Sequence, residues 1–279
     1  MEMDIKGEAE ADLVKVTGDL CNQGKVVFTI HADGIMPASG KFKLIEYTGD
    51  FKGSVDNFSV NGLKGVSYRI INEDKAVYLV IHEQREAATG VRWTGETDSN
   101  WNYQTENFTL DGMATGFVAN DEVEFTDEAT RTVVNVDELM PVKQIVVDNT
   151  KTYTFKGNGG FSGDGSLVKN GEGDLLLNLT KSDYTGATVI NGGTVTVKEL
   201  ADGGIPSSFG AASASADNLK IGKAVLKIDN ANTATNRGMT LTDSAVIQVA
   251  GGTTSFKGMI KGKGTLIKKD AGQLNITFG

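Results

Sequence analysis

Residues 163–179 read GDGSLVKNGEGDLLLNL, and residues 262–278 read GKGTLIKKDAGQLNITF. Glycines, lysines and large apolar residues recur at corresponding positions of the two stretches, 99 residues apart and without a gap. Within each stretch the apolar residues alternate, as at Leu175, Leu177 and Leu179. Side chains two residues apart lie on one face of a β-strand, so this alternation predicts short strands that each bury one face.

The same alternation extends through the chain, for example at Val26, Phe28 and Ile30. Long runs with helical spacing of apolar residues are nearly absent. Gly, Asn or Asp separates the predicted strands every ~8–12 residues. The 279 residues include 35 Gly and only 3 Pro, a composition that favours tight turns between ordered strands. We therefore predict an all-β protein with few or no helices.

Internal repetition favours a β-solenoid over a sandwich or a barrel, because stacked coils must present similar residues to one another. The 99-residue unit is longer than one coil of roughly 20–30 residues, so we expect it to span about four coils that bury the same face. Leu167 and Lys169 are two residues apart, so a straight strand would place both side chains on the same buried face. We expect positive φ at Gly171 and Gly173 to bend the chain and carry Lys169 out of the core. The Ala- and Ser-rich residues 210–216 predict a loop.

Residues 163–197 resemble the autotransporter-associated β-strand repeat of bacterial surface proteins. The resemblance rests on the G-x-G-x-L-x-K and L-x-L patterns quoted above and on DYTG at 183–186, although Val195 stands where leucine is usual. WTG at 93–95 is similar to the segment that opens such modules, and GKFKLIEY at 40–47 is similar to one that closes them. The resemblance implies a right-handed parallel β-helix, a single-stranded solenoid.

The order of these stretches implies parts of two modules. We expect residues 1–86 to be closing coils of a preceding β-helix module and residues 87–140 to be a Trp-containing opening segment. Residues 141–279 would be the repeat coils of the second module, truncated at the C-terminus. In a segment of a longer tandem protein, Leu274, Ile276 and Phe278 should form a poorly covered edge.

Charge and hydropathy exclude several classes of function. The net charge of −9 argues against a nucleic-acid partner, because such proteins neutralise phosphates with basic residues. No apolar run approaches the ~20 residues of a membrane helix, and the first residues lack the pattern of a signal segment. The single cysteine, Cys21, is expected to be a small buried apolar residue.

No motif for a phosphate-binding loop, a dinucleotide or a zinc protease occurs. His31 and His82 are expected to be ordinary surface or turn residues. The acidic residues between Asp121 and Glu128 alternate with Val123 and Phe125, which is the pattern of a strand with its acids outward. We therefore predict no catalytic residue, no metal and no cofactor.

Two groups of residues are candidates for ligand binding. Lys257, Lys261 and Lys263 could form a basic stripe that holds an anionic glycan, or a solvated face that keeps strand edges soluble. Trp93 and Trp101 could stack on sugars, or they could plug an end of the coil stack.

The sequence thus predicts a non-catalytic structural or display segment of an exported, adhesin-like bacterial surface protein. Its expected partners are other modules of the same longer chain and cell-surface or host glycans. The alternative is a β-helix that binds or cleaves an anionic polysaccharide. In either case we expect the segment at the cell surface or outside the cell.

Overall fold

The computed structural model describes residues 1–6, 10–32, 39–63, 66–82, 85–198, 200–229 and 232–277. In these ranges the chain forms strands β1 to β32 and two short 3₁₀ helices, η1 (Val55–Asn57) and η2 (Ala216–Asn218). The prediction of an all-β protein with few helices is confirmed. No helix in this part of the chain is long and apolar enough to cross a membrane.

The chain divides into two compact units, Met1–Glu86 and Ala87–Gly279. The expected assignment of residues 1–86, 87–140 and 141–279 to parts of two modules stays a prediction.

The first unit contains three sheets. Two are four-stranded, in the orders β2-β1-β5-β8 and β3-β6-β10-β9, and the third pairs β4 with β7. Phe28, Phe42 and Leu79 are fully buried in its core. Its strands are β1 (Glu2–Lys6), β2 (Glu10–Ala11), β3 (Val14–Val16), β4 (Leu20–Asn22), β5 (Val26–Ala32), β6 (Gly40–Tyr47), β7 (Phe51–Gly53), β8 (Phe58–Asn61), β9 (Tyr68–Glu73) and β10 (Ala76–Ile81).

Antiparallel pairs distinguish the first unit from the parallel coils expected there. β1 pairs with β2, β6 with β10, and β9 with β10 in antiparallel fashion. The β9–β10 turn has Asp74 and Lys75 at its centre, with φ of 48° and 59°. Two left-handed central residues define the tight turn that joins antiparallel strands. The first unit therefore combines parallel and antiparallel pairs, and the expectation that residues 1–86 are closing coils of a β-helix module stays a prediction.

The second unit contains two long sheets and two short ones. Its ten-stranded sheet has the order β13-β12-β11-β14-β17-β20-β22-β24-β27-β30. From β11 to β30 every neighbouring pair is parallel, whereas β11–β12 and β12–β13 are antiparallel. The strands are β11 (Val91–Trp93), β12 (Phe108–Leu110), β13 (Met113–Thr115), β14 (Glu122–Thr126), β17 (Gln144–Asp148), β20 (Ser166–Lys169), β22 (Thr188–Ile190), β24 (Leu219–Ile221), β27 (Met239–Leu241) and β30 (Ile260–Gly262).

The other sheets of the second unit are parallel throughout. The seven-stranded sheet contains β15 (Val133–Asn135), β18 (Tyr153–Lys156), β21 (Asp174–Asn178), β23 (Thr194–Val197), β25 (Val225–Ile228), β28 (Ser244–Val249) and β31 (Thr265–Lys269). The short sheets are β16 (Leu139–Pro141) with β19 (Gly160–Ser162), and β26 (Thr233–Thr235) with β29 (Thr253–Phe256) and β32 (Gln273–Ile276).

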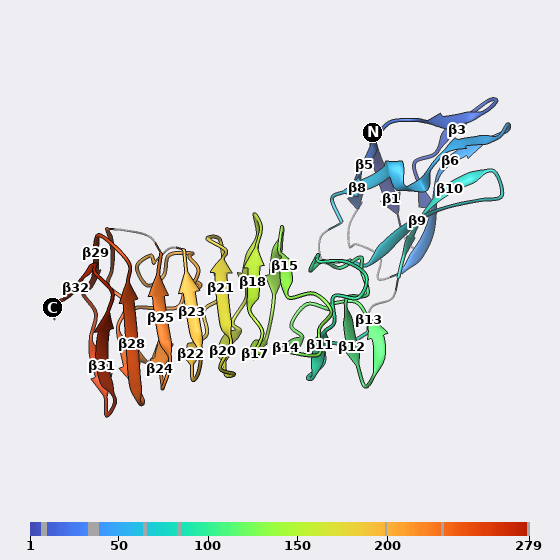
Figure 1. The fold of residues 1–279 in the computed structure, drawn as a ribbon. Coiled ribbons are helices and arrows are strands. Elements are labelled where there is room, and N and C mark those ends of the chain that lie inside the picture. Colours follow the sequence, from blue (N-terminus) through green and yellow to red (C-terminus); the bar gives the residue numbers. More distant parts are fainter. Residues whose placement is uncertain are drawn as a thin grey trace. The chain divides into compact units, whose positions relative to one another are not determined.

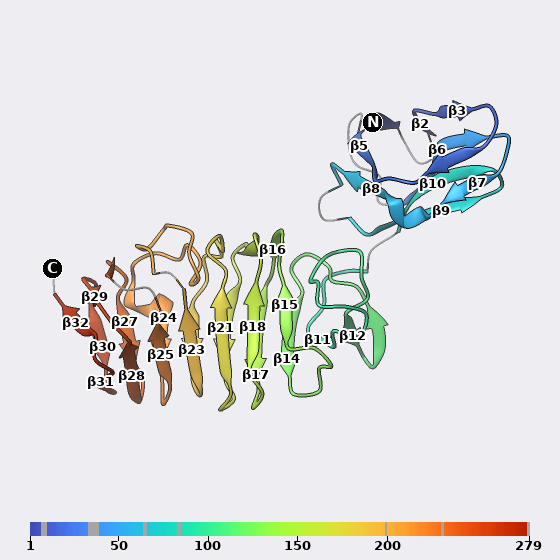
Figure 2. The same ribbon diagram turned by 45° about the horizontal axis from the view of Figure 1, so that its top comes forward.

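The chain visits these sheets in turn. After β14 in the ten-stranded sheet come β15 in the seven-stranded sheet and β16 in a short sheet, and β17 then returns beside β14. We call one such passage a rung. Figure 1 shows the strands of the seven-stranded sheet side by side in chain order, and Figure 2 shows the same succession after rotation.

Successive rungs keep a nearly constant length. Register partners in the ten-stranded sheet are residues 124, 146, 168, 189, 220, 240 and 261. The step is 20 to 22 residues, except between Val189 and Lys220 (220 − 189 = 31). This longer rung contains the predicted loop, since residues 210–216 include no strand.

The strand alternation read from the sequence is confirmed by burial. Leu175, Leu177 and Leu179 are at most 1% exposed. In the last rung, Leu274 and Ile276 are only partly buried. Phe278, expected beside them, lies outside the described residues.

The two copies of the 99-residue repeat do not occupy the same faces. β20 lies in the ten-stranded sheet, whereas its counterpart β31 lies in the seven-stranded sheet. Likewise β21 lies in the seven-stranded sheet and its counterpart β32 in the three-stranded sheet. Equivalent strands of the two copies therefore lie in different sheets of the stack. The repeated unit is compatible with either place because every parallel strand of the stack needs the same alternation.

Candidate functional site

The three predicted lysines lie on different parts of the second unit. Lys257 follows β29, Lys261 lies within β30, and Lys263 follows β30; all three are exposed. The Lys261 ammonium lies 2.8 Å from a carboxylate oxygen of Asp217, and this hydrogen bond lowers the pKa of Asp217. The lysines therefore do not share one register column, and their role in glycan binding stays a prediction.

The predicted tryptophans are buried. Trp93 is 0% and Trp101 1% exposed, so neither indole face is open to a sugar. The Trp93 Nε1–H donates to the carbonyl of Arg131 at 2.7 Å. Trp101 contacts Phe117 with ring centroids 5.2 Å apart, and it contacts Phe161 at 5.4 Å. The predicted sugar-stacking platform is therefore wrong, because these rings fill the interior beside the first parallel strands of the stack.

The acidic residues between Asp121 and Glu128 hold turns together. The buried Asp121 accepts hydrogen bonds from the backbone N–H groups of Ala88 at 2.9 Å and Val118 at 2.8 Å. Asp127 accepts from the backbone N–H groups of Lys151 and Thr150, and these bonds lower the pKa of Asp127. These carboxylates connect neighbouring segments of backbone.

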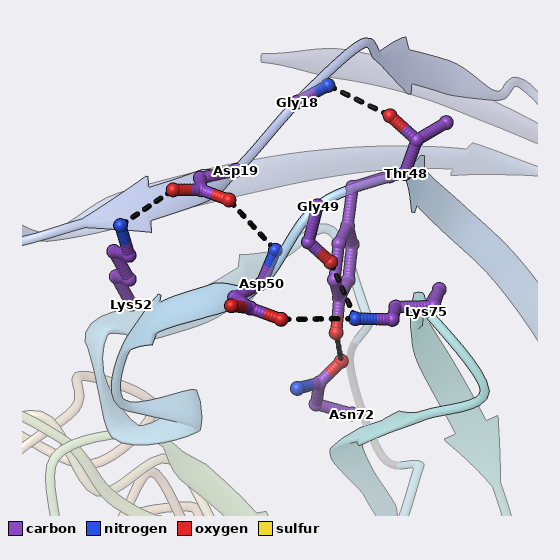
Figure 3. Close-up of polar contacts among 9 residues, drawn as sticks. Gly18, Asp19, Thr48, Gly49, Asp50, Lys52, Asn72 and Lys75 are labelled. Carbon is purple, nitrogen blue, oxygen red and sulfur yellow. Dashed lines mark hydrogen bonds and ion pairs between the residues drawn. The ribbon is translucent and has the colours of Figure 1, made fainter.

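A polar cluster in the first unit joins two turns (Figure 3). One Asp19 carboxylate oxygen accepts from the Asp50 N–H at 2.8 Å, and the other lies 2.5 Å from the Lys52 ammonium. These two interactions lower the pKa of Asp19. Lys75 donates to the carbonyl of Gly49 at 2.5 Å and contacts the Asp50 carboxylate at 3.2 Å. Every charged group of this cluster is paired, so we assign it a structural role.

Cys21 and the histidines lie elsewhere in the first unit. Cys21 is exposed on β4, so the expectation of a small buried apolar residue is wrong. Among the described residues, β4 pairs with β7 in a two-stranded sheet. His31 is exposed on β5, and His82 follows β10 and is half-buried. Among the described residues, no group of three or more His, Cys, Asp or Glu is arranged to hold a metal.

Lys169 is buried, contrary to expectation. Its side chain is 0% exposed, and its ammonium donates to the carbonyls of Asn170 at 2.9 Å and Gly171 at 2.5 Å. The carbonyl of Gly192, in the next rung, lies 3.4 Å away. Burial lowers the pKa of Lys169 to about 8, although nearby carboxylates, chiefly Asp148, oppose this effect.

The glycines after Lys169 act by close approach of backbone and not by positive φ. Neither Gly171 nor Gly173 has a positive φ. A Cβ atom on Gly171 would instead lie 2.1 Å from the carbonyl oxygen of Asn149. The turn therefore packs tightly on the preceding rung, and its carbonyls converge on the lysine.

A second buried cation organises the long rung. Arg237 is 3% exposed, and its guanidinium donates to the carbonyls of Gly210 at 2.7 Å, Ala201 at 3.0 Å and Ala212 at 3.3 Å. Phe209, in the same loop, is 2% exposed. The loop thus packs against the stack around Arg237.

The sequence did not predict a polar groove along one corner of the stack. The groove encloses about 880 Å³ and is lined by Lys156, Gly157, Asn158, Asn178, Thr180, Lys198 and Asp229. We call it the corner groove. Its residues lie at or just after the carboxyl ends of β18, β21, β23 and β25. Register pairs Lys156 with Asn178, and the pairing of Leu177 with Val197 places Lys198 next along. The N–H of Asp229 donates to the carbonyl of Val197, which places Asp229 beyond Lys198.

These groove residues can be recognised as neighbours only when the strand register is known. Lys156, Asn178 and Lys198 are 22 and 20 residues apart, which matches the rung length. The repeat quoted from the sequence has a spacing of 99 residues and does not bring these positions together.

Comparison with known proteins gives one partial match. Over 93 residues, a third of this chain, the sequence is 44% identical to the protein named Adhesin BmaC autotransporter from Brucella suis biovar 1 (strain 1330). The aligned part is 3% of that protein's length. No family model and no solved structure matches the chain. The chain is thus an all-β protein with parallel sheets that is similar, over a third of its length, to part of an autotransporter adhesin.

Proposed function

We propose that residues 87–279 form a right-handed parallel β-helix that serves as a structural and display segment of an exported, adhesin-like bacterial surface protein. The observation that carries the proposal is the regular register of the second unit. From β14 to β30, parallel partners recur every 20 to 22 residues except for one step of 31 residues (220 − 189 = 31), while the chain passes through the sheets in a fixed order.

This architecture suits a spacer. Backbone hydrogen bonds connect each rung to the next along the two long sheets, so bending the stack would disturb many bonds at once. Side chains on the outward faces project at a repeat of about 4.8 Å, which suits weak contacts repeated along a surface. The partial match to an autotransporter adhesin supports an exported, surface-bound role.

We propose further that the segment is non-catalytic and that its first partners are other parts of the same longer chain. The carboxylates of Asp19, Asp121 and Asp127 accept backbone hydrogen bonds, and Glu128 forms an ion pair with Arg92. A second candidate function of the same segment, binding of an anionic polysaccharide, is supported by the corner groove.

Surface labelling tests the exported role. Antibodies raised against the 279-residue chain should label intact bacteria that express the parent protein, and protease added to those cells should remove the signal. Labelling that appears only after lysis would contradict export. Beads coated with the chain should adhere to host-cell layers more than albumin-coated beads; equal adherence would contradict the adhesin-like role.

A turnover assay tests the non-catalytic role. The chain should release no reducing ends or unsaturated products from a panel of neutral and anionic polysaccharides. Product formation proportional to protein concentration would overturn this part of the proposal.

A further inference from the structure

We propose that the corner groove binds a linear anionic glycan that lies along the stack, across successive rungs. The inference deepens the proposed function and rests on it, because a surface segment of this kind needs a defined contact site. The groove is elongated because its lining residues come from successive neighbouring strands, in the order Lys156, Asn178, Lys198 and Asp229. With strands about 4.8 Å apart, these four positions cover roughly 14 Å.

Two unpaired cations give the groove its preference for charge. Among the described residues, neither Lys156 nor Lys198 has an ion-pair partner, and both are exposed. They are two strands apart, or about 9.5 Å. By contrast, Lys261 is paired with Asp217. An acidic polymer with carboxylate or sulfate groups at regular intervals would find two free ammonium groups at a fixed spacing.

The side chains between and beside the lysines suit a hydroxyl-rich ligand. Asn158, Asn178 and Thr180 make no side-chain hydrogen bond to any described residue. Their amide and hydroxyl groups both donate and accept, as sugar hydroxyls do. Gly157 packs against the preceding rung: a Cβ atom there would lie 2.2 Å from the carbonyl oxygen of Val136, so no larger residue fits without a shift of backbone.

The far end of the groove limits the charge pattern. The Asp229 carboxylate lies 3.3 Å from the ammonium of Lys227, and this pair partly neutralises it. A carboxylate accepts hydrogen bonds from sugar hydroxyls but repels acidic groups. The anionic groups of the glycan therefore lie at Lys156 and Lys198, and a neutral sugar unit lies at Asp229.

The lining disfavours other polymers. The described residues that line the groove include no aromatic side chain, whereas single-stranded nucleic acids bind through stacked bases. Peptide ligands commonly anchor on apolar or aromatic pockets, which this lining also lacks. A polyanion made of sugars satisfies the lining best.

Binding measurements on the intact 279-residue chain test the proposal. The probes are fluorescently labelled oligogalacturonate, a sulfated oligosaccharide of equal length, and neutral maltooligosaccharide. At least one anionic probe should bind and the neutral one should not, with affinity falling as salt rises. The Lys156→Gln/Lys198→Gln double variant should bind about tenfold or more weakly, because each lysine would lose a charge-assisted hydrogen bond.

Lys25→Gln/Lys223→Gln is the matched control, since it removes two exposed lysines elsewhere and should keep wild-type affinity. Which anionic probe binds more tightly distinguishes uronate from sulfate recognition. The proposal is overturned if neither anionic probe binds at millimolar concentration, or if the groove variant binds as well as wild type. Failure of the surface role would show separately, as absent labelling of intact cells that express the unaltered parent protein.

Discussion

The ammonium nitrogen of Lys169 lies 3.4 Å from the carbonyl oxygen of Gly192 and thereby joins two successive rungs through a buried positive charge. The same ammonium also holds the carbonyls of its own turn. Lys268, the counterpart in the second copy of the repeat, contacts only the carbonyl of Asp270 and is exposed. The two lysines therefore form a natural pair for comparing a buried with an exposed cation.

The lowered pKa of Lys169 predicts that the free energy of unfolding increases as the pH rises above about 8. Its pKa is about 8 in the folded chain and 10.5 in the unfolded chain, so between these values the unfolded state binds more protons. The penalty for burying the charge is present below about pH 8 and is relieved as pH rises toward 10. Urea unfolding followed by the fluorescence of Trp93 and Trp101 should show increasing stability over this range. Above pH 10 the raised pKa values of buried Tyr103 and Tyr184, each about 12, should reverse the trend.

The Lys169→Met variant should lack this rise, since it removes the titrating group. Lys268→Met is the control and should keep it. A rise of equal size in Lys169→Met would show that another group is responsible.

Replacing Arg237 should loosen the long rung. Arg237→Met removes the one side chain that donates to the carbonyls of Ala201, Gly210 and Ala212 together, although each carbonyl keeps one other hydrogen bond. We expect a loss of about 2–4 kcal/mol in the free energy of unfolding and faster proteolysis within residues 200–218. Arg237→Lys should rescue little, because an ammonium lacks the planar fork that reaches several carbonyls. The control variant Lys223→Met changes an exposed residue and should behave as wild type. Unchanged proteolysis in Arg237→Met would contradict the proposal that Arg237 holds the loop against the stack.

Truncating Trp101 should weaken the aromatic cluster. The ring lies between Phe117 and Phe161 and is 1% exposed. Trp101→Ala should cost about 3–5 kcal/mol in the free energy of unfolding, measured by circular dichroism in urea. Met113→Ala, at a residue 70% exposed, should cost much less. Equal costs would mean that the cluster does not stabilise this end of the unit.

A valine at Gly112 should strain the hairpin between β12 and β13. Asp111 and Gly112 have φ of 53° and 78°, and a Cβ at Gly112 would meet no atom within 4 Å. The cost of Gly112→Val is therefore one of backbone conformation, about 1–2 kcal/mol in thermal or urea unfolding. Gly251→Val is the matched control, because its Cβ also meets nothing and its φ is not positive. Equal stability of the two variants would contradict this reason.

Much of the fold was predictable from local pattern. Alternation at Leu175 and Leu177 identifies a strand and its buried face, because side chains that recur every two residues lie on one face of a β-strand. The same pattern carries no information on which sheet a strand joins, so the sequence could not assign β20 and β31 to different sheets. The sequence analysis predicted neither the antiparallel pair β9–β10 nor the antiparallel pair β12–β13. Asp111-Gly112 is a typical hairpin turn, so β12–β13 could have been predicted, whereas Asp74-Lys75 gives no such signal.

The candidate site was less predictable, because it depends on register. Lys156 and Lys198 are unremarkable in the sequence and become neighbours of Asn178 only through strand pairing. Trp93 and Trp101 were considered for sugar binding by residue type, and burial decides otherwise. Lys169 was expected to leave the core. Its burial could not be predicted from the sequence, because the carbonyls that receive its charge come from its own turn and from the next rung.

The one-sheet offset between the copies has an evolutionary corollary. If recombination between the two gene segments removed one 99-residue unit, β31 would take over the position of β20 and pair in the ten-stranded sheet. The exchanged strand would still bury one face, since the alternating apolar residues match, although the turns differ: Asp270 has a φ of 69°, whereas its counterpart Gly171 has no positive φ. Every exposed side chain downstream would then point in a new direction, so a deletion that leaves the scaffold intact would still redraw the surface that other molecules encounter.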